Sequence, residues 1–508
     1  MRKLLAGIIL AAVSGCAVNP VTGDRDLILV SGQQELAMGV QNYAPMKQSQ
    51  GGTYDVDPEL NRYVEEVGQK VAAASGVDLP YEFTVLNNSI PNAWAPPAGK
   101  IAINRGLLTE MQSEAELAAV LGHEVVHAAA RHSAQQQSRG MLAQIGVLAT
   151  GIAANDSDYG NLIVGGASVG AQMLMMKYGR GAELESDKYG MRYMSKAGYD
   201  PVGAVSLQET FVRLSEGRNQ DWLSGLFASH PPSQERVDAN RKRLKNLPSG
   251  GIIGKERYRA ALAKTMRLKP AYDAYDEGRK ALSDKKADEA LALANQALGL
   301  FPDEAHFHAL RGDVRLMNEQ YDMAVTNFNR AIARRESFFY YHLQRGLARH
   351  ELGQNDGALV DLGRSLELLP TAPAHFVLGE IKEERGATGE AAEHYKIVAK
   401  SGGNYGKAAA EKLYRLELPS QPATYIESAC GDDGSGEVVV QVRNITSVAV
   451  TGVQAAFQYV DSGGTQRQRS VAFPGIIAPG KVASARTGLA PYPKTSCAAK
   501  VTAAQLSE

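Results

Sequence analysis

Small residues recur with a fixed period in the second half of this 508-residue chain. The positions that share a spacing of 34 residues are Gly278, Gly312, Gly346, Ala290, Ala324 and Ala358. A period of this length is typical of stacked helix hairpins, in which small residues let two antiparallel helices pack closely. Gly379 and Ala391 follow 33 residues after their predecessors, so one connection is a residue shorter. The sequence therefore predicts an α-solenoid of about four hairpins over residues 271–404.

The period is that of tetratricopeptide repeats, which expose a concave surface to peptide or protein partners. Six of the ten histidines lie in this region without the spacing of metal ligands, and we interpret them as packing or surface residues. A chain of this length is expected to form roughly two to four domains, because single hydrophobic cores stop growing well below it. The repeats therefore account for only part of the function.

The charge balance of the chain argues against one class of partner. Lysine and arginine number 54 against 55 acidic residues, which gives a formal net charge of −1 and a sequence pI of about 6.8. Proteins that bind nucleic acid through its phosphates carry a strongly basic surface instead. We therefore expect no nucleic-acid partner.

Residues 1–15 have the pattern of an export signal. Two basic residues precede an apolar run over residues 4–13, and a pair of small residues stands directly before Cys16. This arrangement resembles a bacterial lipobox, in which Cys16 would be lipidated and begin the mature chain. Ala17 at the next position favours the outer membrane of a Gram-negative cell, so we expect a periplasmic lipoprotein anchored there. An ordinary signal peptide with an incidental cysteine is the alternative.

Residues 420–508 differ in character and predict a small β-sandwich. Residues 437–443 and 453–459 have strand character, and glycine-containing turns separate them. The two remaining cysteines, Cys430 and Cys497, lie in this region. An exported chain meets an oxidising compartment, so we expect a disulfide between them, with two buried free thiols as the alternative. Binding or docking is the only function that we expect of this region.

A candidate metal site lies in the first half of the chain, in the motif His123-Glu124-x-x-His127. The surrounding residues 113–131 are rich in alanine and leucine and predict a helix. Residues four apart share a helix face, so both imidazoles can reach one metal ion. Glu124 would point toward the open coordination position, where it can act as a general base on water. The alternative is a partly buried helix with two incidental histidines.

A second helical segment, over residues 178–188, offers further ligands. Glu183 and Asp187 are four residues apart and therefore lie on one helix face. A carboxylate is a normal third zinc ligand beside two histidines, and an acid one turn away can accept a ring N–H from a ligating histidine. A solvated acidic helix face is the alternative interpretation of the same two residues.

Together these motifs resemble metallopeptidase family forty-eight, which includes the CAAX prenyl proteases. The chain is most similar to the exported BepA-type zinc metalloproteases, which carry C-terminal tetratricopeptide repeats. Asn19-Pro-Val-Thr-Gly23 and Ser229-His230-Pro231 also match motifs of that family. The resemblance implies a mainly helical, α+β, zincin-type metallopeptidase domain over residues 17–265, and it extends through the repeats. The C-terminal β region lies outside it.

Carried over by position, the resemblance implies one Zn²⁺ ion per subunit, with a set of three protein ligands: His123, His127 and Glu183. Glu124 would be the general base, and Asp187 would support catalysis as the partner of a ligating histidine. His230 matches a histidine that can occupy the fourth zinc position and keep the enzyme latent. The alternative role for His230 is to anchor a loop.

The sequence therefore predicts a zinc-dependent endopeptidase of the bacterial cell envelope that cleaves misfolded or stalled envelope and outer-membrane proteins. The repeats would recruit unfolded substrates or the outer-membrane β-barrel assembly machinery, and the lipid would hold the chain at the membrane. The alternating segment over residues 100–104 is expected to pair with an extended substrate as an edge strand. The alternative is a chaperone or scaffold for outer-membrane protein assembly whose protease site is mostly latent.

Overall fold

The computed structural model describes the following residues: 16–147, 178–217, 229–432, 437–460, 464–489 and 497–507. The predicted export signal over residues 1–15 lies outside them. The chain divides into two compact units, and the boundary falls within the repeats. The first unit comprises residues 1–354 and 364–369, and the second comprises 355–363 and 370–508. In the described parts of the chain, no helix is both long and apolar enough to cross a membrane.

The first unit opens with a short antiparallel hairpin and two helices: β1 (Cys16–Val18), β2 (Arg25–Leu27), α2 (Gly32–Ser49) and α3 (Pro58–Ser75). A small mixed sheet follows, with the strands β3 (Glu82–Leu86), β4 (Ala93–Trp94) and β5 (Lys100–Asn104). Strand β5 pairs in parallel with β3 and antiparallel with β4, so it is the middle strand.

This strand order corrects one expectation from the sequence. The segment over residues 100–104 cannot accept a substrate strand, because both of its edges already pair with β3 and β4. The residues before it contribute the edge strand β4, in which Ala93 pairs with Ile103. A two-residue strand leaves no alternation that could be read from sequence, which is why the edge was missed.

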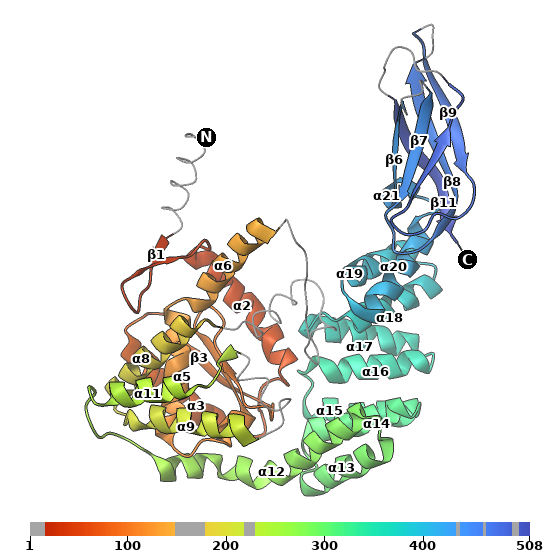
Figure 1. Cartoon of the computed structure of the whole chain (residues 1–508). Helices are drawn as coiled ribbons and strands as arrows, with labels where there is room; N and C mark the ends of the chain where they lie inside the picture. The colour runs from red at the N-terminus through yellow and green to blue at the C-terminus, as the bar shows by residue number, and fades with distance from the viewer. Residues whose placement is uncertain are drawn as a thin grey trace, which may run out of the picture. The chain divides into compact units, whose positions relative to one another are not determined.

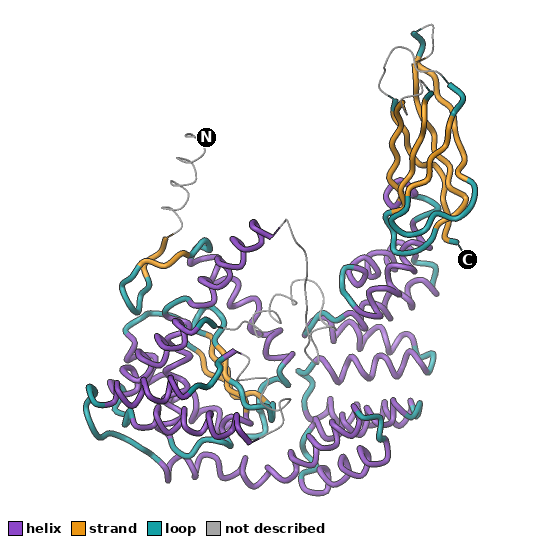
Figure 2. Tube along the Cα trace, in the orientation of Figure 1, coloured by secondary structure: helices purple, strands orange, loops and turns teal. Residues whose placement is uncertain are grey.

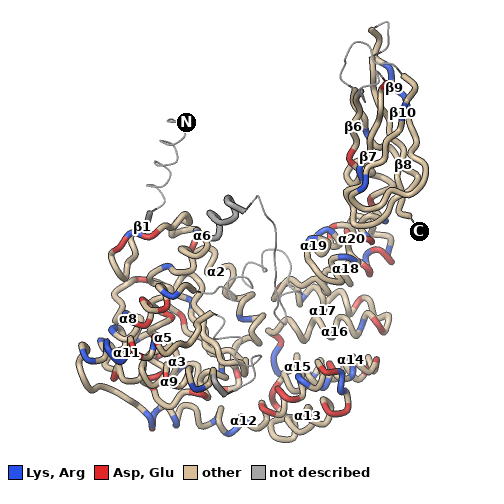
Figure 3. The backbone as a smooth tube through the Cα atoms, in the orientation of Figure 1, with Lys and Arg blue, Asp and Glu red and all other residues tan. Residues whose placement is uncertain are grey.

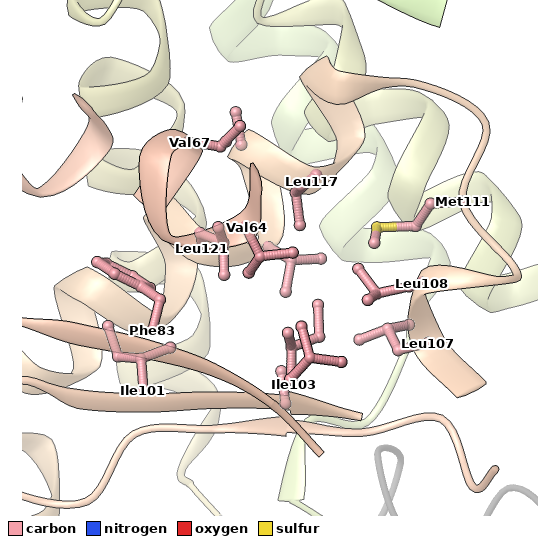
Figure 4. Packing of buried hydrophobic residues seen from close by; sticks show 14 of the residues in the cluster. Val64, Val67, Phe83, Ile101, Ile103, Leu107, Leu108, Met111, Leu117 and Leu121 are labelled. Atoms are coloured by element: carbon pink, nitrogen blue, oxygen red, sulfur yellow. The ribbon is translucent and has the colours of Figure 1, made fainter. Parts of the chain in front are cut away.

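Helices surround this sheet (Figure 1), and the remaining ones before the repeats are α4 (Arg105–Leu108), α5 (Glu114–Ala129), α6 (His132–Val147), α8 (Arg180–Lys196), α9 (Val202–Gly217) and α11 (Gln234–Leu244). The Ser113 hydroxyl caps α5 by accepting the Glu116 backbone N–H. Every residue of α5 is buried. Figure 4 shows the apolar side of this core, in which Leu117 and Leu121 of α5 lie near Val64 of α3 and Ile103 of β5.

The repeats form a series of helix pairs: α12 (Lys255–Ser283), α13 (Ala287–Leu300), α14 (Ala305–Met317), α15 (Tyr321–Arg334), α16 (Phe339–Glu351), α17 (Asn355–Leu368), α18 (Ala372–Glu384) and α19 (Thr388–Ala399). The second helices of the pairs begin at residues 287, 321, 355 and 388, which reproduces the spacing seen in the sequence. A Cβ atom on Gly312 would lie 2.8 Å from the Phe328 ring of the paired helix, so only glycine permits this approach. The predicted repeat architecture is confirmed.

Helix α12 differs from the expected domain boundary. It runs unbroken through residues 265–271, where the sequence predicted the end of one domain and the start of the next. Tyr258 and Leu262 in its first half and Tyr272 in its second half belong to one hydrophobic core. The helix continues because the same core supports both halves, and Pro270 lies inside it.

The first repeats contact the end of α2 and the segment that follows it, within the first unit. His306 Nε2 donates to the Gly51 carbonyl at 3.1 Å, and Arg335 Nη1 donates to the same oxygen at 3.2 Å. The Gln48 side chain bridges to the repeats by donating to Ser337 O and accepting from Phe339 N. Burial lowers the pKa of His306 to about 4, so this imidazole is neutral in the folded chain.

We expect this buried histidine to make the first unit acid-sensitive. The unfolded chain takes up a proton near pH 6.5 while folded His306 resists protonation until about pH 4, so stability is present above pH 6.5 and is lost as the pH falls toward 4. The loss amounts to at most about 3 kcal/mol. Urea denaturation at pH 7 and pH 4.5 measures it, and His306→Gln should reduce the difference between the two pH values. An unchanged difference would assign the acid sensitivity to other groups.

The second unit ends in a β-rich region with two three-stranded antiparallel sheets (Figure 2). The helices before it are α20 (Gly403–Glu417) and α21 (Pro422–Tyr425). One sheet has the order β10 (Val482–Arg486), β7 (Val438–Asn444), β6 (Ile426–Asp432), and the other β11 (Ala498–Leu506), β8 (Val450–Val460), β9 (Gln466–Phe473). Both sheets share one hydrophobic core that includes Val440 and Phe457. Cys430 and Cys497 form a disulfide with their Cα atoms 5.5 Å apart.

Acidic and basic residues are interspersed along the repeat helices, as Figure 3 shows for α13 to α15 and α18 to α20. Several of them pair between neighbouring positions of one helix, as Arg364 does with Glu367 and Lys396 does with Glu393. Exposed pairs of this kind contribute little stability, on the order of 0–1 kcal/mol each. Buried side chains between the helices, such as Phe307, Phe328 and Tyr341, therefore stabilise the repeats more than these charges do.

Candidate metal centre

The wholly buried helix α5 and the buried face of α8 bring the predicted ligands together. Helix α5 carries His123 and His127, and α8 carries Glu183 and Asp187. The helices approach closely at a pair of glycines: a Cβ atom on Gly190 would lie 2.9 Å from the His123 backbone nitrogen. A larger residue at that position would push α8 away from α5. The two motifs, 56 residues apart between His127 and Glu183, therefore meet because small residues line the contact between their helices.

Four side chains converge on one point. His123, His127, Glu183 and His230 each offer one ligand atom, and these atoms all lie within 4.8 Å of one another. The nearest pairs are His123 Nε2–His127 Nε2 at 3.0 Å, His123 Nε2–His230 Nδ1 at 3.3 Å, His127 Nε2–Glu183 Oε1 at 3.3 Å and His230 Nδ1–Glu183 Oε1 at 3.0 Å. Tetrahedral ligands with bonds of about 2.0–2.1 Å stand about 3.3–3.4 Å apart. The donor set therefore fits a four-coordinate metal ion.

The electrostatics of the cluster also fit a cation. Burial by itself would lower the pKa of His123, but the carboxylates of Glu183 and Asp187 outweigh it and raise that pKa to about 9. The pocket thus attracts positive charge to the point where the ligand atoms meet. Burial lowers the pKa of His127 well below its ordinary value, so this imidazole is neutral, as a metal ligand must be.

Asp187 fixes the orientation of His123. Its Oδ1 atom lies 3.0 Å from His123 Nδ1, so the ring N–H donates to it when Nε2 faces a metal. Arg236 of α11 donates to both Asp187 oxygens, at 2.7 and 2.8 Å, and lies 2.9 Å from Glu183 Oε2. Burial would raise the pKa of Asp187, but Arg236 and His123 bring it down to about 2. The carboxylate is therefore ionised at any physiological pH.

Glu124 stands beside the cluster without joining it. Its Oε1 atom lies 3.6 Å from His230 Nε2, and the residue is buried. Within the described residues, neither Glu124 Oε2 nor His230 Nε2 has a hydrogen-bond partner. Burial raises the pKa of the Glu124 carboxyl, although His230 and His123 act in the opposite direction. A carboxylate with a raised pKa and one oxygen free of hydrogen bonds, next to four candidate ligand atoms, is suited to accept a proton.

The structure thus brings together six residues that the sequence proposed for the site: His123, Glu124, His127, Glu183, Asp187 and His230. Cys16 opens β1 and belongs to a different part of the first unit, and its lipidation remains a prediction. The sequence missed Arg236, His132 and Tyr178. The Tyr178 ring lies 4.0 Å from the His127 ring, and His132 contacts the other nitrogen of His127. A basic residue six positions after His230 was the only available sign of Arg236.

Comparison with known proteins places this domain among peptidases. The family model described as "Peptidase family M48" matches residues 58–244. A putative beta-barrel assembly-enhancing protease of Vibrio cholerae is 31% identical over 244 residues, which cover 46% of this chain and 50% of that protein. The metalloprotease YcaL of Escherichia coli is 33% identical over 181 residues, covering 34% of this chain and 68% of that protein.

The repeats have structural neighbours of their own. The first tetratricopeptide domain of Spaghetti (RPAP3) bound to an HSP90 peptide is 24% identical and covers 23% of this chain and 95% of that one, with a TM-score of 0.23. The chain spans about half the length of the Vibrio relative, and the match with that relative covers less than half of this chain. The matched residues 58–244 hold all six residues proposed for the metal site: five lie on α5 and α8, and His230 lies just before α11. Over these residues the chain belongs to peptidase family M48.

Proposed function

We propose that this chain is a zinc-dependent endopeptidase of the bacterial cell envelope that acts on misfolded or stalled envelope and outer-membrane proteins. The observation that carries the proposal is the convergence of His123, His127 and Glu183 beside Glu124, whose buried Oε2 atom has no hydrogen-bond partner among the described residues. Nitrogen and carboxylate ligands from two helices are the set that zinc peptidases use. Membership of family M48 supports the same reaction.

The side chains have separable roles in peptide-bond hydrolysis. A zinc ion held by His123, His127 and Glu183 would supply Lewis acidity that polarises the scissile carbonyl and acidifies water. Glu124 takes a proton from the attacking water and later gives it to the leaving amine. Asp187 holds the Nδ1–H tautomer of His123, so that Nε2 keeps its lone pair for the metal.

A pocket next to these groups supports a peptide substrate. It is lined by Glu124, His123 and His230 on one side and by the apolar side chains Leu107, Val120, Met191, Leu207 and Phe211 on the other. The cavity is small in this structure, at about 30 Å³, so we expect an apolar side chain of a substrate to enter it as the lining residues move apart, with its peptide bond reaching Glu124. Such side chains are exposed in unfolded proteins and hidden in folded ones, which agrees with a role in quality control.

Two observations support the proposed location and role in the cell envelope. The predicted lipobox before Cys16 favours export and an anchor in the outer membrane. The Vibrio relative is named for beta-barrel assembly, and we extend that setting to this chain, with the repeats recruiting substrates or the assembly machinery.

Metal removal tests the enzymatic part of the proposal. Purified full-length chain should contain about one zinc ion and cleave an unfolded protein such as β-casein, and chelation by 1,10-phenanthroline should abolish cleavage. Addition of Zn²⁺ to the stripped protein should restore it. Cleavage that persists in metal-free protein would overturn the proposal.

The position of His230 favours a second candidate function, that of a scaffold with a mostly latent protease site. Its Nδ1 atom lies 3.0 Å from Glu183 Oε1 and 3.3 Å from His123 Nε2, where a fourth ligand would stand. A metal with four protein ligands has no free position for water or substrate. The two functions differ in their need for Glu124: a scaffold remains functional in cells when Glu124→Gln replaces the natural chain, whereas an essential protease does not.

His230→Ala is expected to raise the rate of peptide cleavage about 3–10-fold if His230 closes the site in most molecules. The gain equals the inverse of the fraction of molecules that is open in the natural chain. Cleavage of β-casein at matched zinc content measures it. Equal or lower activity would show that His230 instead anchors its loop or assists the reaction.

A further inference from the structure

The nitrogen of His127 that faces away from the metal site contacts a buried histidine that the proposed reaction does not use. His132 Nδ1 lies 3.0 Å from His127 Nδ1, and the residue is 3% exposed. His132 Nε2 lies 3.4 Å from Glu185 Oε1 of α8. Each of the two ligating histidines on α5 therefore has a partner behind it: Asp187 for His123 and His132 for His127.

The chemistry of these contacts sets the direction of each hydrogen bond. When Nε2 of His127 binds a metal, its Nδ1 carries the only ring proton and must donate. His132 Nδ1 then accepts this proton, so the proton of neutral His132 resides on Nε2 and is donated to the Glu185 carboxylate. The result is a relay in which a carboxylate fixes the tautomer of one imidazole, and that imidazole fixes the tautomer of the ligand.

The relay continues to the N-terminal segment. The Asn19 side-chain amide donates to Glu185 Oε1 at 3.1 Å and to Asp26 Oδ2 at 3.0 Å, and Asn19 is 1% exposed. Its Oδ1 atom accepts the backbone N–H groups of Val21 and Thr22, which fixes the amide in place. The motif Asn19-Pro-Val-Thr-Gly23 has no part in the proposed reaction. Through Asn19 it contacts Glu185, the carboxylate that orients His132.

Residues 16–31, which we call the N-terminal strap, are held at further points by α6 and by Arg131, which lies just before that helix. Gln135 of α6 donates to Asp26 at 2.9 Å, and Ser138 accepts the Leu29 backbone N–H at 2.8 Å. Arg131 donates to the Val30 carbonyl at 3.1 Å. The strap is therefore a fixed part of the first unit. Of the strap residues that make these contacts, Asn19 is the one whose side chain reaches Glu185.

We propose that Asn19, Glu185 and His132 are positioning residues that orient the metal ligand His127, so that the N-terminal strap helps to set the metal affinity of the site. The inference rests on the proposed role of His127 as a ligand. None of the three residues touches a substrate or the metal. They act by holding His127 Nε2 toward the ion and by making that nitrogen a stronger donor.

The test compares metal binding in full-length variants. His132→Phe keeps the ring but cannot accept the His127 proton, and Glu185→Ala removes the carboxylate. Both are expected to bind Zn²⁺ about 10–100-fold more weakly in competition with a chromogenic chelator. Asn19→Ala should weaken binding by a smaller factor, because Glu185 then keeps its charge but loses a restraint. His132→Gln, whose amide oxygen can accept a proton from His127, should recover part of the affinity.

Two further measurements separate positioning from general stability. The d–d spectrum of the Co²⁺-substituted chain should shift in His132→Phe, and kcat for peptide cleavage should fall with little change in KM. Ser138→Ala is the matched control, since it removes a contact of the strap with no link to Glu185, and it should bind Zn²⁺ as the natural chain does. If His132→Phe does not fold, Glu185→Ala carries the test, because that side chain is only partly buried at 25% exposure.

Different outcomes would overturn the relay, the proposed metal site or the positioning role of the strap. Zn²⁺ affinity within twofold of the natural chain in both Glu185→Ala and His132→Gln, with an unchanged Co²⁺ spectrum, would overturn the relay. A natural chain that binds zinc no better than His127→Ala would instead overturn the proposed metal site. Equal losses in Ser138→Ala and Asn19→Ala would show that the strap acts only through stability.

Discussion

Glu124→Gln is expected to lower kcat/KM for peptide cleavage by about 10²–10⁴-fold while the chain keeps its metal. The amide has nearly the same shape as the carboxylate but cannot take a proton from water. The metal stays because Glu124 contributes no atom to the cluster of His123, His127, Glu183 and His230. Cleavage of an unfolded substrate and zinc content, measured on the same preparation, check both halves of the expectation.

A matched control for this variant lies on the same helix. Glu116→Gln also replaces a buried carboxylate of α5, one that accepts hydrogen bonds from Gln112 N and Ser206 Oγ. An amide oxygen can accept one of these, and the residue lies two helical turns from Glu124, so activity should stay within about twofold. A Glu124→Gln chain that cleaves at the rate of this control would remove Glu124 from the mechanism.

Arg236→Met is expected to destabilise the first unit by about 3–5 kcal/mol, because it leaves two buried carboxylates without their cation. Arg236 is 4% exposed and donates to both oxygens of Asp187 while it approaches Glu183. Its loss also frees Asp187, which orients His123. Urea denaturation measures the loss, and hydrogen exchange in α8 and α11 locates it.

Arg241→Met on the same helix provides the comparison. Arg241 is 53% exposed, and its partners Glu209 and Asp238 are exposed as well. Solvent screens such pairs, so the expected loss is below about 1 kcal/mol. Similar losses in the two variants would mean that the buried network around Asp187 contributes no more than a surface ion pair.

The site has an inner set of candidate ligands and an outer set of side chains that contact those ligands from behind. The candidate ligand atoms belong to four side chains, and each histidine of α5 that we propose as a ligand has a partner behind it, Asp187 for His123 and His132 for His127. Asp187 is in turn held by Arg236, and His132 by Glu185. A latent state is compatible with this arrangement, because His230 Nδ1 lies 3.0 Å from Glu183 Oε1 and 3.3 Å from His123 Nε2, where a fourth ligand would stand.

The sequence predicted much of this site from local rules. The spacing of His123 and His127 places both on one helix face, and the same rule pairs Glu183 with Asp187. The 34-residue period predicted the repeats because each hairpin must place a small residue where its helices cross, as Gly312 does against Phe328. Turn residues and alternation predicted strands in the C-terminal region, where the structure has two sheets around one core.

What the sequence by itself determined is therefore the set of features that depend on neighbours along the chain: which residues of α5 and α8 share a helix face, and the period at which the repeat helices recur. The tertiary structure alone decided the features that depend on distant segments. Strand β4 became the sheet edge, α12 continued across an expected boundary, and Arg236, His132 and Asn19 joined the metal site. The physical reason is that a buried charge or ring proton must find a partner wherever folding places one, and sequence spacing carries no record of that choice.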